Sequence, residues 1–309
     1  MALFISPIWV LFVKSGDKLG KGIRTSARDA MLSDECSKEN KGKVFGLHRA
    51  MDTCGAAIGP SLALIFLFYY PAHYKSLFLF AFIPGMIAVS FTFLIKEKTI
   101  LTPIKTNKED SSRFKFFSYF SYWKKSSRDY KKIVIGLLLF TLLNSSDVFL
   151  LLMAKQMGIN DVHIIGVYIF YNLVYALFSY PMGALADKIG MKTTFIIGLI
   201  LFAGVYLGMA FVKTEMMLYA LFFIYGIYAA CTDGVSKAWV AKITPKEETA
   251  TALGFYASFT SIATMLASFI AGILWVSFNP ATTFIVSGTG VLLVIIYFSY
   301  NSKHLKDNH

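Results

Sequence analysis

Charged residues are scarce in this chain of 309 amino acids, where Asp, Glu, Lys and Arg together make up 16%. A water-soluble domain carries about 25%. Hydrophobic residues make up 56% of the chain and gather in long runs. Those runs reach about 20 residues, the length a helix needs to cross the hydrocarbon core of a bilayer. The scarcity of charge excludes an ordinary soluble domain and predicts an all-α, polytopic membrane protein.

Long apolar runs predict eight complete spans. They lie at roughly 44–67, 76–95, 132–153, 162–182, 194–212, 216–235, 252–275 and 281–300. A ninth apolar piece, ALFISPIWVLFV at 2–13, is too short to cross alone and lacks the features of a signal peptide. We interpret it as the end of a span whose beginning precedes Met1.

Cysteine and histidine are also few. Cys36, Cys54 and Cys231 show no metal-ligand spacing, the five histidines are scattered, and no Gly-Lys-Ser/Thr phosphate loop occurs. We therefore expect no enzymatic activity, no cofactor, no metal and no structural disulfide. Without a nucleotide site, uphill transport would have to draw on an ion gradient.

The net charge of +12 is concentrated in alternate loops. Residues 14–43, 96–132, 186–193, 236–249 and 301–309 hold 26 of the 30 Lys and Arg. This is the positive-inside pattern, so these loops and the C-terminus are expected to face the cytoplasm from a plasma (inner) membrane. The charge thus reports topology and contact with lipid, and it does not support a nucleic-acid partner.

An internal repeat appears when the sequence is shifted by 208 residues. Residues 27–47 then lie over 235–255 without a gap, with the same order of loop, span, outer loop and span after them. This predicts two parallel repeats: a partial first bundle over 1–95, a cytoplasmic linker over 96–131, and a six-helix bundle with a short tail over 132–309. On this interpretation about 80 residues with three spans precede Met1, and the complete protein is a twelve-span monomer.

The second part of the linker, RFKFFSYFSYWKK at 113–125, mixes aromatic residues with cations. It could form an interfacial helix or pack on the bundle as an ordinary linker.

The loop GALADKIGMK at 183–192 resembles the loop signature of the major facilitator superfamily. The matching positions include Gly183, Asp187, Lys188, Gly190 and Lys192. Two glycines permit a tight turn, and Asp187 can cap a helix end or pair with a cation. The resemblance implies an MFS-type two-bundle transporter, with about nine of twelve helices present, in which this loop gates the cytoplasmic face.

A second pattern, Gly46, Gly55, Gly59 and Pro60, resembles a motif of antiporters in the same family, although Ala63 and Leu64 replace its final glycines. Small residues one turn apart let a neighbouring helix approach closely. The pattern indicates a close helix seam that restricts leak, or generic small-residue packing.

Ionisable residues enter the span at 44–67. Arg49 lies about 8 Å and Asp52 about 12 Å along it, and Asp52 can meet either Arg49 or His48 on the helix surface. Asp52 is either a proton-coupling carboxylate or one partner of a structural ion pair. We expect it to share the face of Gly55 and Gly59, turned toward protein.

Asn144 and Asp147 lie three apart in the span 132–153 and are expected to share a face with Gly136 and Phe140. Asp147 has no cation within one turn, so it is a candidate for the substrate or proton site. A helix–helix hydrogen bond is the alternative.

Asp233 and Lys237, four apart at the inner end of the span 216–235, are expected to form an ion pair. Arg24, Arg28 and Asp29 are expected to belong to a cytoplasmic ion-pair network, or to be solvated.

The stretches 17–35, 48–52, 144–147 and 232–242 look like a bacterial branch of the superfamily to which we can assign no substrate. The resemblance implies a secondary transporter working by alternating access. Proton-coupled efflux (antiport) of a small organic solute is the leading hypothesis. Symport, facilitated diffusion, and a non-transporting sensor, scaffold or inactive fragment are the alternatives.

Overall fold

The computed structural model describes residues 24–25, 27–93 and 118–300. The short apolar piece at 2–13, the start of the linker and the C-terminal tail lie outside the described residues. Within the described part every regular element is helical. After helical residues 27–34 come η1 (Lys38–Asn40), α2 (Lys41–Tyr69), α3 (Tyr74–Thr92), α4 (Ser118–Lys125), α5 (Arg128–Leu143), α6 (Val148–Gln156), α7 (Asp161–Ile189), α8 (Met191–Ala210), α9 (Glu215–Ile243), η2 (Lys246–Glu248), α10 (Thr249–Ser277) and α11 (Pro280–Tyr300).

Eight helical segments of the described part are long and apolar enough to cross a membrane, as the sequence predicts, and one of them consists of α5 and α6 together. Helices are favoured because lipid cannot hydrogen-bond an exposed peptide group. Helices α7 and α9 each have 29 residues and so extend about 43 Å, well beyond the hydrocarbon core. Their extra turns continue past the predicted ends 182 and 235, toward the side where the Lys- and Arg-rich loops lie. We call this side of the helices the basic end.

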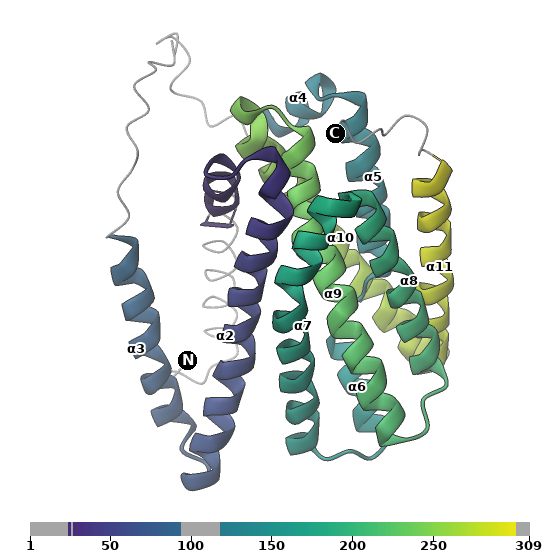
Figure 1. Ribbon diagram of the computed structural model, residues 1–309. Helices are drawn as coiled ribbons and strands as arrows, with labels where there is room; N and C mark the ends of the chain where they lie inside the picture. Colours follow the sequence, from purple (N-terminus) through teal and green to yellow (C-terminus); the bar gives the residue numbers. More distant parts are fainter. Residues whose placement is uncertain (1–23, 26, 94–117, 301–309) are drawn as a thin grey trace. The chain divides into compact units, whose positions relative to one another are not determined.

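The chain divides into two compact units. Of the described residues, one unit comprises 62–93 and 118–121, and the other comprises 24–25, 27–61 and 122–300. In the first unit α3 contacts the end of α2 through the rings of Phe66 and Phe80, which meet edge-on at 5.7 Å. In the second unit α9 lies between α7 and α8, and α11 packs on α8 and α5 (Figure 1).

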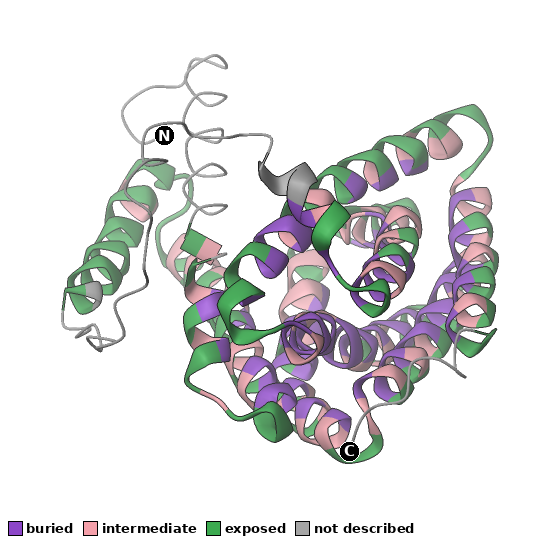
Figure 2. Ribbon diagram, turned by 90° about the horizontal axis from the view of Figure 1, so that it is seen from above, coloured by how far each residue is buried: buried purple, intermediate pink, exposed green. Residues whose placement is uncertain are grey.

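The core of the second unit is aromatic. Trp239 of α9, Phe195 of α8 and Phe298 of α11 are almost fully buried, and the rings of Phe195 and Trp239 each lie 5.5 Å from that of Phe298. Figure 2 shows the buried residues gathered on the facing sides of these helices. These buried contacts fix the position of α9 against its neighbours, and α9 carries much of the site described below.

One predicted span is not a single helix. The sequence predicts a continuous helix over 132–153, but α5 ends at Leu143 and α6 begins at Val148. The intervening Asn-Ser-Ser-Asp has side chains that compete for backbone hydrogen bonds, which favours an interruption. The expectation that Asn144 and Asp147 share one helical face with Gly136 and Phe140 is therefore wrong.

Helix α4 packs on the basic end of the second unit. The buried ring of Tyr122 lies 5.5 Å from that of Tyr130, and Trp123 stacks on Phe255 at 5.4 Å. Burial, reinforced by the nearby carboxylate of Glu248, raises the pKa of Tyr122 to about 12. Of the two possibilities for the linker, these contacts correspond to packing on the bundle.

Candidate functional site

The carboxylate of Asp187 caps the first turn of α2 at the basic end. Its two oxygens accept hydrogen bonds from the backbone N–H groups of Gly42 and Lys43, both at 2.8 Å. The first N–H groups of a helix have no partner within the helix, and the helix dipole favours a negative charge there. The sequence leaves open whether Asp187 caps a helix or pairs with a cation, and in the structure it caps α2.

Two glycine patterns that the sequence treats separately meet at this joint. A Cβ on Gly183 of α7 would overlap the carbonyl of Gly42, and a Cβ on Gly46 would lie 2.6 Å from the carbonyl oxygen of Ser179. The backbones of α2 and α7 can approach this closely only because the side chains are absent. The close seam therefore runs through Gly42, Gly46 and Gly183.

The rest of the predicted seam is not packed. No described atom outside the helix's own backbone lies within 4 Å of a Cβ built on Gly55 or Gly59, and Pro60 lies within the continuous helix α2. Since no described residue packs on the face of Gly55 and Gly59, the expectation that this face turns toward protein stays a prediction. Small residues one turn apart create a helix surface that another helix can approach closely. Whether another helix packs there depends on the rest of the fold.

The turn between α7 and α8 is made by Gly190, whose φ of 97° favours glycine. Lys188 lies exposed in the last turn of α7, and Lys192 lies half-buried at the start of α8. The predicted gating loop is thus a tight turn that presents Asp187 to α2.

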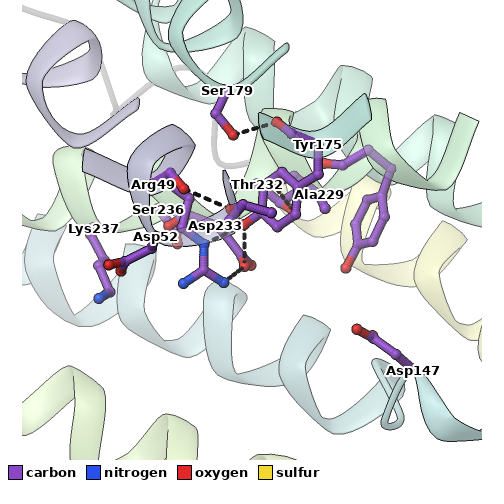
Figure 3. Close-up of polar contacts among 12 residues, drawn as sticks. Arg49, Asp52, Asp147, Tyr175, Ser179, Ala229, Thr232, Asp233, Ser236 and Lys237 are labelled. Atoms are coloured by element: carbon purple, nitrogen blue, oxygen red, sulfur yellow. Dashed lines mark hydrogen bonds and ion pairs between the residues drawn. The ribbon is translucent and has the colours of Figure 1, made fainter. Parts of the chain in front are cut away.

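Arg49 of α2 reaches across to α9. Its guanidinium forms an ion pair with Asp233 and donates from Nε to the hydroxyl of Tyr175 on α7 (Figure 3). The same hydroxyl donates to Asp233 at 2.6 Å. Three helices thereby share one polar contact. The expected pair of Asp233 with Lys237 is not formed, and of the two partners that the spacing allows Asp52 it does not take Arg49, because Arg49 and Asp233 pair with each other across the helices.

The remaining charges pair closer to the basic end. Lys237 donates to Asp29 at 2.6 Å, and Asp29 is almost fully buried. Arg28 lies 3.5 Å from Asp29 and 3.6 Å from Asp52.

His48 meets Asp52 at 3.8 Å, which is one of the two contacts that the spacing allows. Arg24 is exposed. Arg28 and Asp29 thus belong to an ion-pair cluster rather than to solvated loops.

The break between α5 and α6 carries the other carboxylate. Asp147 accepts hydrogen bonds from Tyr225 of α9 at 2.6 Å and from Tyr171 of α7 at 3.4 Å, and no ion pair of the described residues includes it. Asn144 begins the break, and its side-chain oxygen is buried without a hydrogen-bond partner among those residues. Interrupted helices with freed polar groups are a common way of building sites at membrane depth.

Sequence reasoning did not single out the tyrosines. Tyr171 and Tyr175 are one turn apart on α7, and Tyr225 and Tyr228 are one turn apart on α9, with rings of Tyr171 and Tyr225 5.0 Å apart. The spacing of three or four was a usable signal. Tyrosine is common enough in membrane helices that it did not stand out.

A cavity of about 270 Å³ lies beside the Arg49–Asp233 pair. Charged side chains from α2 and α9 form part of its wall, and hydroxyl-bearing side chains of α10 form another part. Its lining is Phe45, His48, Arg49, Asp52, Asp233, Gly234, Ser236, Lys237, Tyr256, Ala257, Thr260 and Ser261. The mixture of ion pairs and hydroxyls can hydrogen-bond a small polar solute.

No group of three or more potential metal ligands occurs among the residues that the structure describes. Cys36, Cys54 and Cys231 are all free thiols. The chemistry of the site is that of ion pairs, hydroxyls and one carboxylate at a helix break.

The fold and the site together define a multi-pass helical membrane protein with ionisable groups enclosed between its helices. The sequence model of the Major Facilitator Superfamily matches residues 1–171 and 133–308, so the chain belongs to this superfamily. It is also similar to an uncharacterized MFS-type transporter of Methanocaldococcus jannaschii, with 34% identity in an alignment 309 positions long that covers 96% of this chain and 74% of the relative. As a member of this family the chain is of the secondary-transporter class.

Solved structures with a similar fold are transporters. The human organic anion transporter MFSD10 (TETRAN) aligns with a TM-score of 0.67 and 14% identity over 88% of this chain and 67% of its own. The proton:xylose symporter XylE aligns with a TM-score of 0.64 and 16% identity over 90% of this chain and 66% of its own. The chain spans about two thirds of each structure, and at this identity the likeness shows the fold alone.

Proposed function

We propose that the complete protein couples the export of a small organic solute to proton entry by alternating access. The observation that carries the proposal is Asp147, a carboxylate at a helix break, held by two tyrosine hydroxyls and in no ion pair of the described residues. An ionisable side chain within a membrane span usually marks a proton or ion pathway. Asp147 is the proposed proton site, and Asn144, at the other end of the same helix break, is the second candidate.

The joint at the basic end is the proposed gate. Asp187, the Gly42–Gly46–Gly183 seam and the Arg49–Asp233 pair all tie α2 to α7 and α9. We assign the basic end to the cytoplasm of a plasma (inner) membrane on the positive-inside pattern. The tied joint then corresponds to a closed cytoplasmic face, and opening it exposes the cavity beside Arg49 to the cell interior.

The remaining assignments follow from the repeat. We propose a partial first bundle over 1–95, a linker over 96–131 and a second bundle over 132–309, working as a monomer that moves a small molecule and protons. Export rests on the antiporter-like glycine pattern, of which Gly46 packs closely. Symport or uniport of the same solute is the alternative within the class, and a sensor or scaffold is the alternative outside it.

The test uses the purified full chain in liposomes that enclose a pH-sensitive dye. A panel of small organic solutes is added one at a time, under inward and outward pH gradients, with and without Na⁺. We expect at least one solute gradient to drive proton movement across the liposome membrane. The substitution Asp147→Asn should abolish that proton movement while leaving the helical content and melting temperature of the protein unchanged. Asp161→Asn, which alters an exposed carboxylate on the same half, is the matched control.

Three results would contradict the proposal. Solute-dependent proton movement that persists in Asp147→Asn would remove the proton site. Movement that requires Na⁺ would change the coupling ion. A chain that moves neither protons nor any solute of the panel would favour the sensor or scaffold.

A further inference from the structure

Two tyrosines, one turn apart on α7, each donate a hydrogen bond to one of the two carboxylates of the site; together with Arg49 we call them the hydroxyl line. Tyr171 donates to Asp147 at 3.4 Å, and Tyr175, one turn further along α7, donates to Asp233 at 2.6 Å. The two rings lie 6.0 Å apart with only 30° between their planes. Since Arg49 donates to the same Tyr175 hydroxyl, the line runs from the helix break to the one guanidinium that ties α2 to α9.

Each hydroxyl has one proton to donate, and this limits what the line can do. When Asp147 is ionised, the hydroxyl of Tyr171 donates its one hydrogen bond to that carboxylate. The hydroxyl of Tyr175 donates its hydrogen bond to Asp233 and accepts one from Arg49 Nε. When Asp147 takes up a proton, its carboxyl group becomes a weaker acceptor for the hydrogen bond from Tyr171. The Tyr171 hydroxyl is then free to donate to the oxygen of Tyr175 instead.

We propose that Tyr171 and Tyr175 form a relay through which protonation of Asp147 releases Arg49 and so opens the basic end. Tyr171 then competes with Arg49 Nε as a donor to the oxygen of Tyr175, which weakens one of the two contacts that hold the guanidinium. No covalent bond changes except the O–H bond formed on Asp147. The inference rests on the proposed proton site and adds how that site reaches the gate.

Electrostatics act in the same direction. The titratable and charged groups around Asp147 are Tyr171 from α7, Tyr225 and, further away, Asp233 and Tyr228 from α9, Tyr206 from α8 through the hydroxyl of Ser145, and Arg49 from α2. Arg49 is the one cation of this set. It attracts the ionised carboxylate only while the joint is tied, so proton uptake favours the state in which Arg49 has left.

The test needs no substrate. Spin labels are placed at Asn40→Cys and Lys246→Cys, two exposed positions at the basic end, after Cys36→Ser, Cys54→Ser and Cys231→Ala. Distance distributions of the full chain in lipid nanodiscs are measured by double electron–electron resonance from about pH 8 to about pH 5. In the parent protein we expect a longer-distance population that grows as the pH falls. In Asp147→Asn we expect this population to be large at both the high and the low end of the pH range.

In Tyr171→Phe the acid-induced rise should shrink about fivefold, the population change that accompanies the loss of one hydrogen bond. Tyr168→Phe is the matched control, because its ring also contacts Tyr171 but its hydroxyl is not in the line, and it should respond as the parent does. A parent-like rise in Tyr171→Phe, with none in Asp147→Asn, overturns the relay and leaves the proton site standing. A parent-like rise in Asp147→Asn, or no rise in the parent, overturns both.

Discussion

Asp29 and Lys237 are 208 residues apart, and they form an ion pair at 2.6 Å. That separation is the offset of the internal sequence repeat, so in the two-repeat interpretation the two residues occupy equivalent positions. Positions related by a two-fold axis touch each other only close to the axis. Lys41 supports this reading, because its Nζ contacts the hydroxyl of Ser33 and the carbonyl of Ala241, which are also 208 apart.

The Asp29–Lys237 pair should be one of the stronger ties of the basic end. Asp29 is only 3% exposed, and without Lys237 it keeps only the longer contact with Arg28 at 3.5 Å; the loss of a buried hydrogen bond to a charged group costs about 1–3 kcal/mol. We expect Lys237→Met to lower the melting temperature clearly in detergent. The exchange Asp29→Lys with Lys237→Asp should recover most of the loss, and a swap that melts as low as the single variant would show that packing, not charge, holds the joint.

The seam between α2 and α7 should not accept a side chain. Gly183→Ala would drive a Cβ into the Gly42 carbonyl, and such overpacking costs about 1–3 kcal/mol. Gly204→Ala on α8 and Gly59→Ala on α2 are matched controls in helices with open space around them. We expect thermal unfolding to separate Gly183→Ala from both controls; a Gly59→Ala variant as unstable as Gly183→Ala would restore the longer, antiporter-like seam.

Arg49 and Asp233 should be energetically coupled. Their side chains are 36% and 41% exposed, so solvent screening limits the coupling to about 1 kcal/mol. A double-mutant cycle of Arg49→Met and Asp233→Asn, followed by thermal unfolding, measures it. Asp52→Asn combined with Arg49→Met is the control, since Asp52 pairs with Arg28 and His48 instead, and those two substitutions should be additive.

Helix α4 should leave the basic end at high pH. The pKa of Tyr122 is about 12 in the folded chain and about 10 when unfolded. The folded state therefore binds the proton more tightly, and the stability of this contact is complete below about pH 10 and lost as the pH rises toward 12. Trp123, stacked on Phe255, reports release through its fluorescence; Tyr122→Phe should remove this pH dependence, and an unchanged profile in that variant would contradict the assignment.

Much of the fold follows from the sequence alone. Runs of about 20 apolar residues must become helices in lipid, because no other local structure satisfies their backbone. The eight spans and the turn at Gly190 follow from such local rules. The repeat also predicted equivalent positions, although not that Asp29 and Lys237 would meet.

Tertiary structure decided which partner each ionisable side chain takes. Arg49, Asp52, Asp233 and Lys237 each have a possible partner on their own helix, yet three of the four pair only across helices and Asp52 pairs both ways. A local ion pair on a helix surface is worth only a few tenths of a kcal/mol, so contacts made as helices pack outweigh it. Helix packing also explains why Gly46 contacts α7, while Gly55 and Gly59 contact no other helix among the described residues. Sequence determines what a helix surface can accept, and packing determines what it meets.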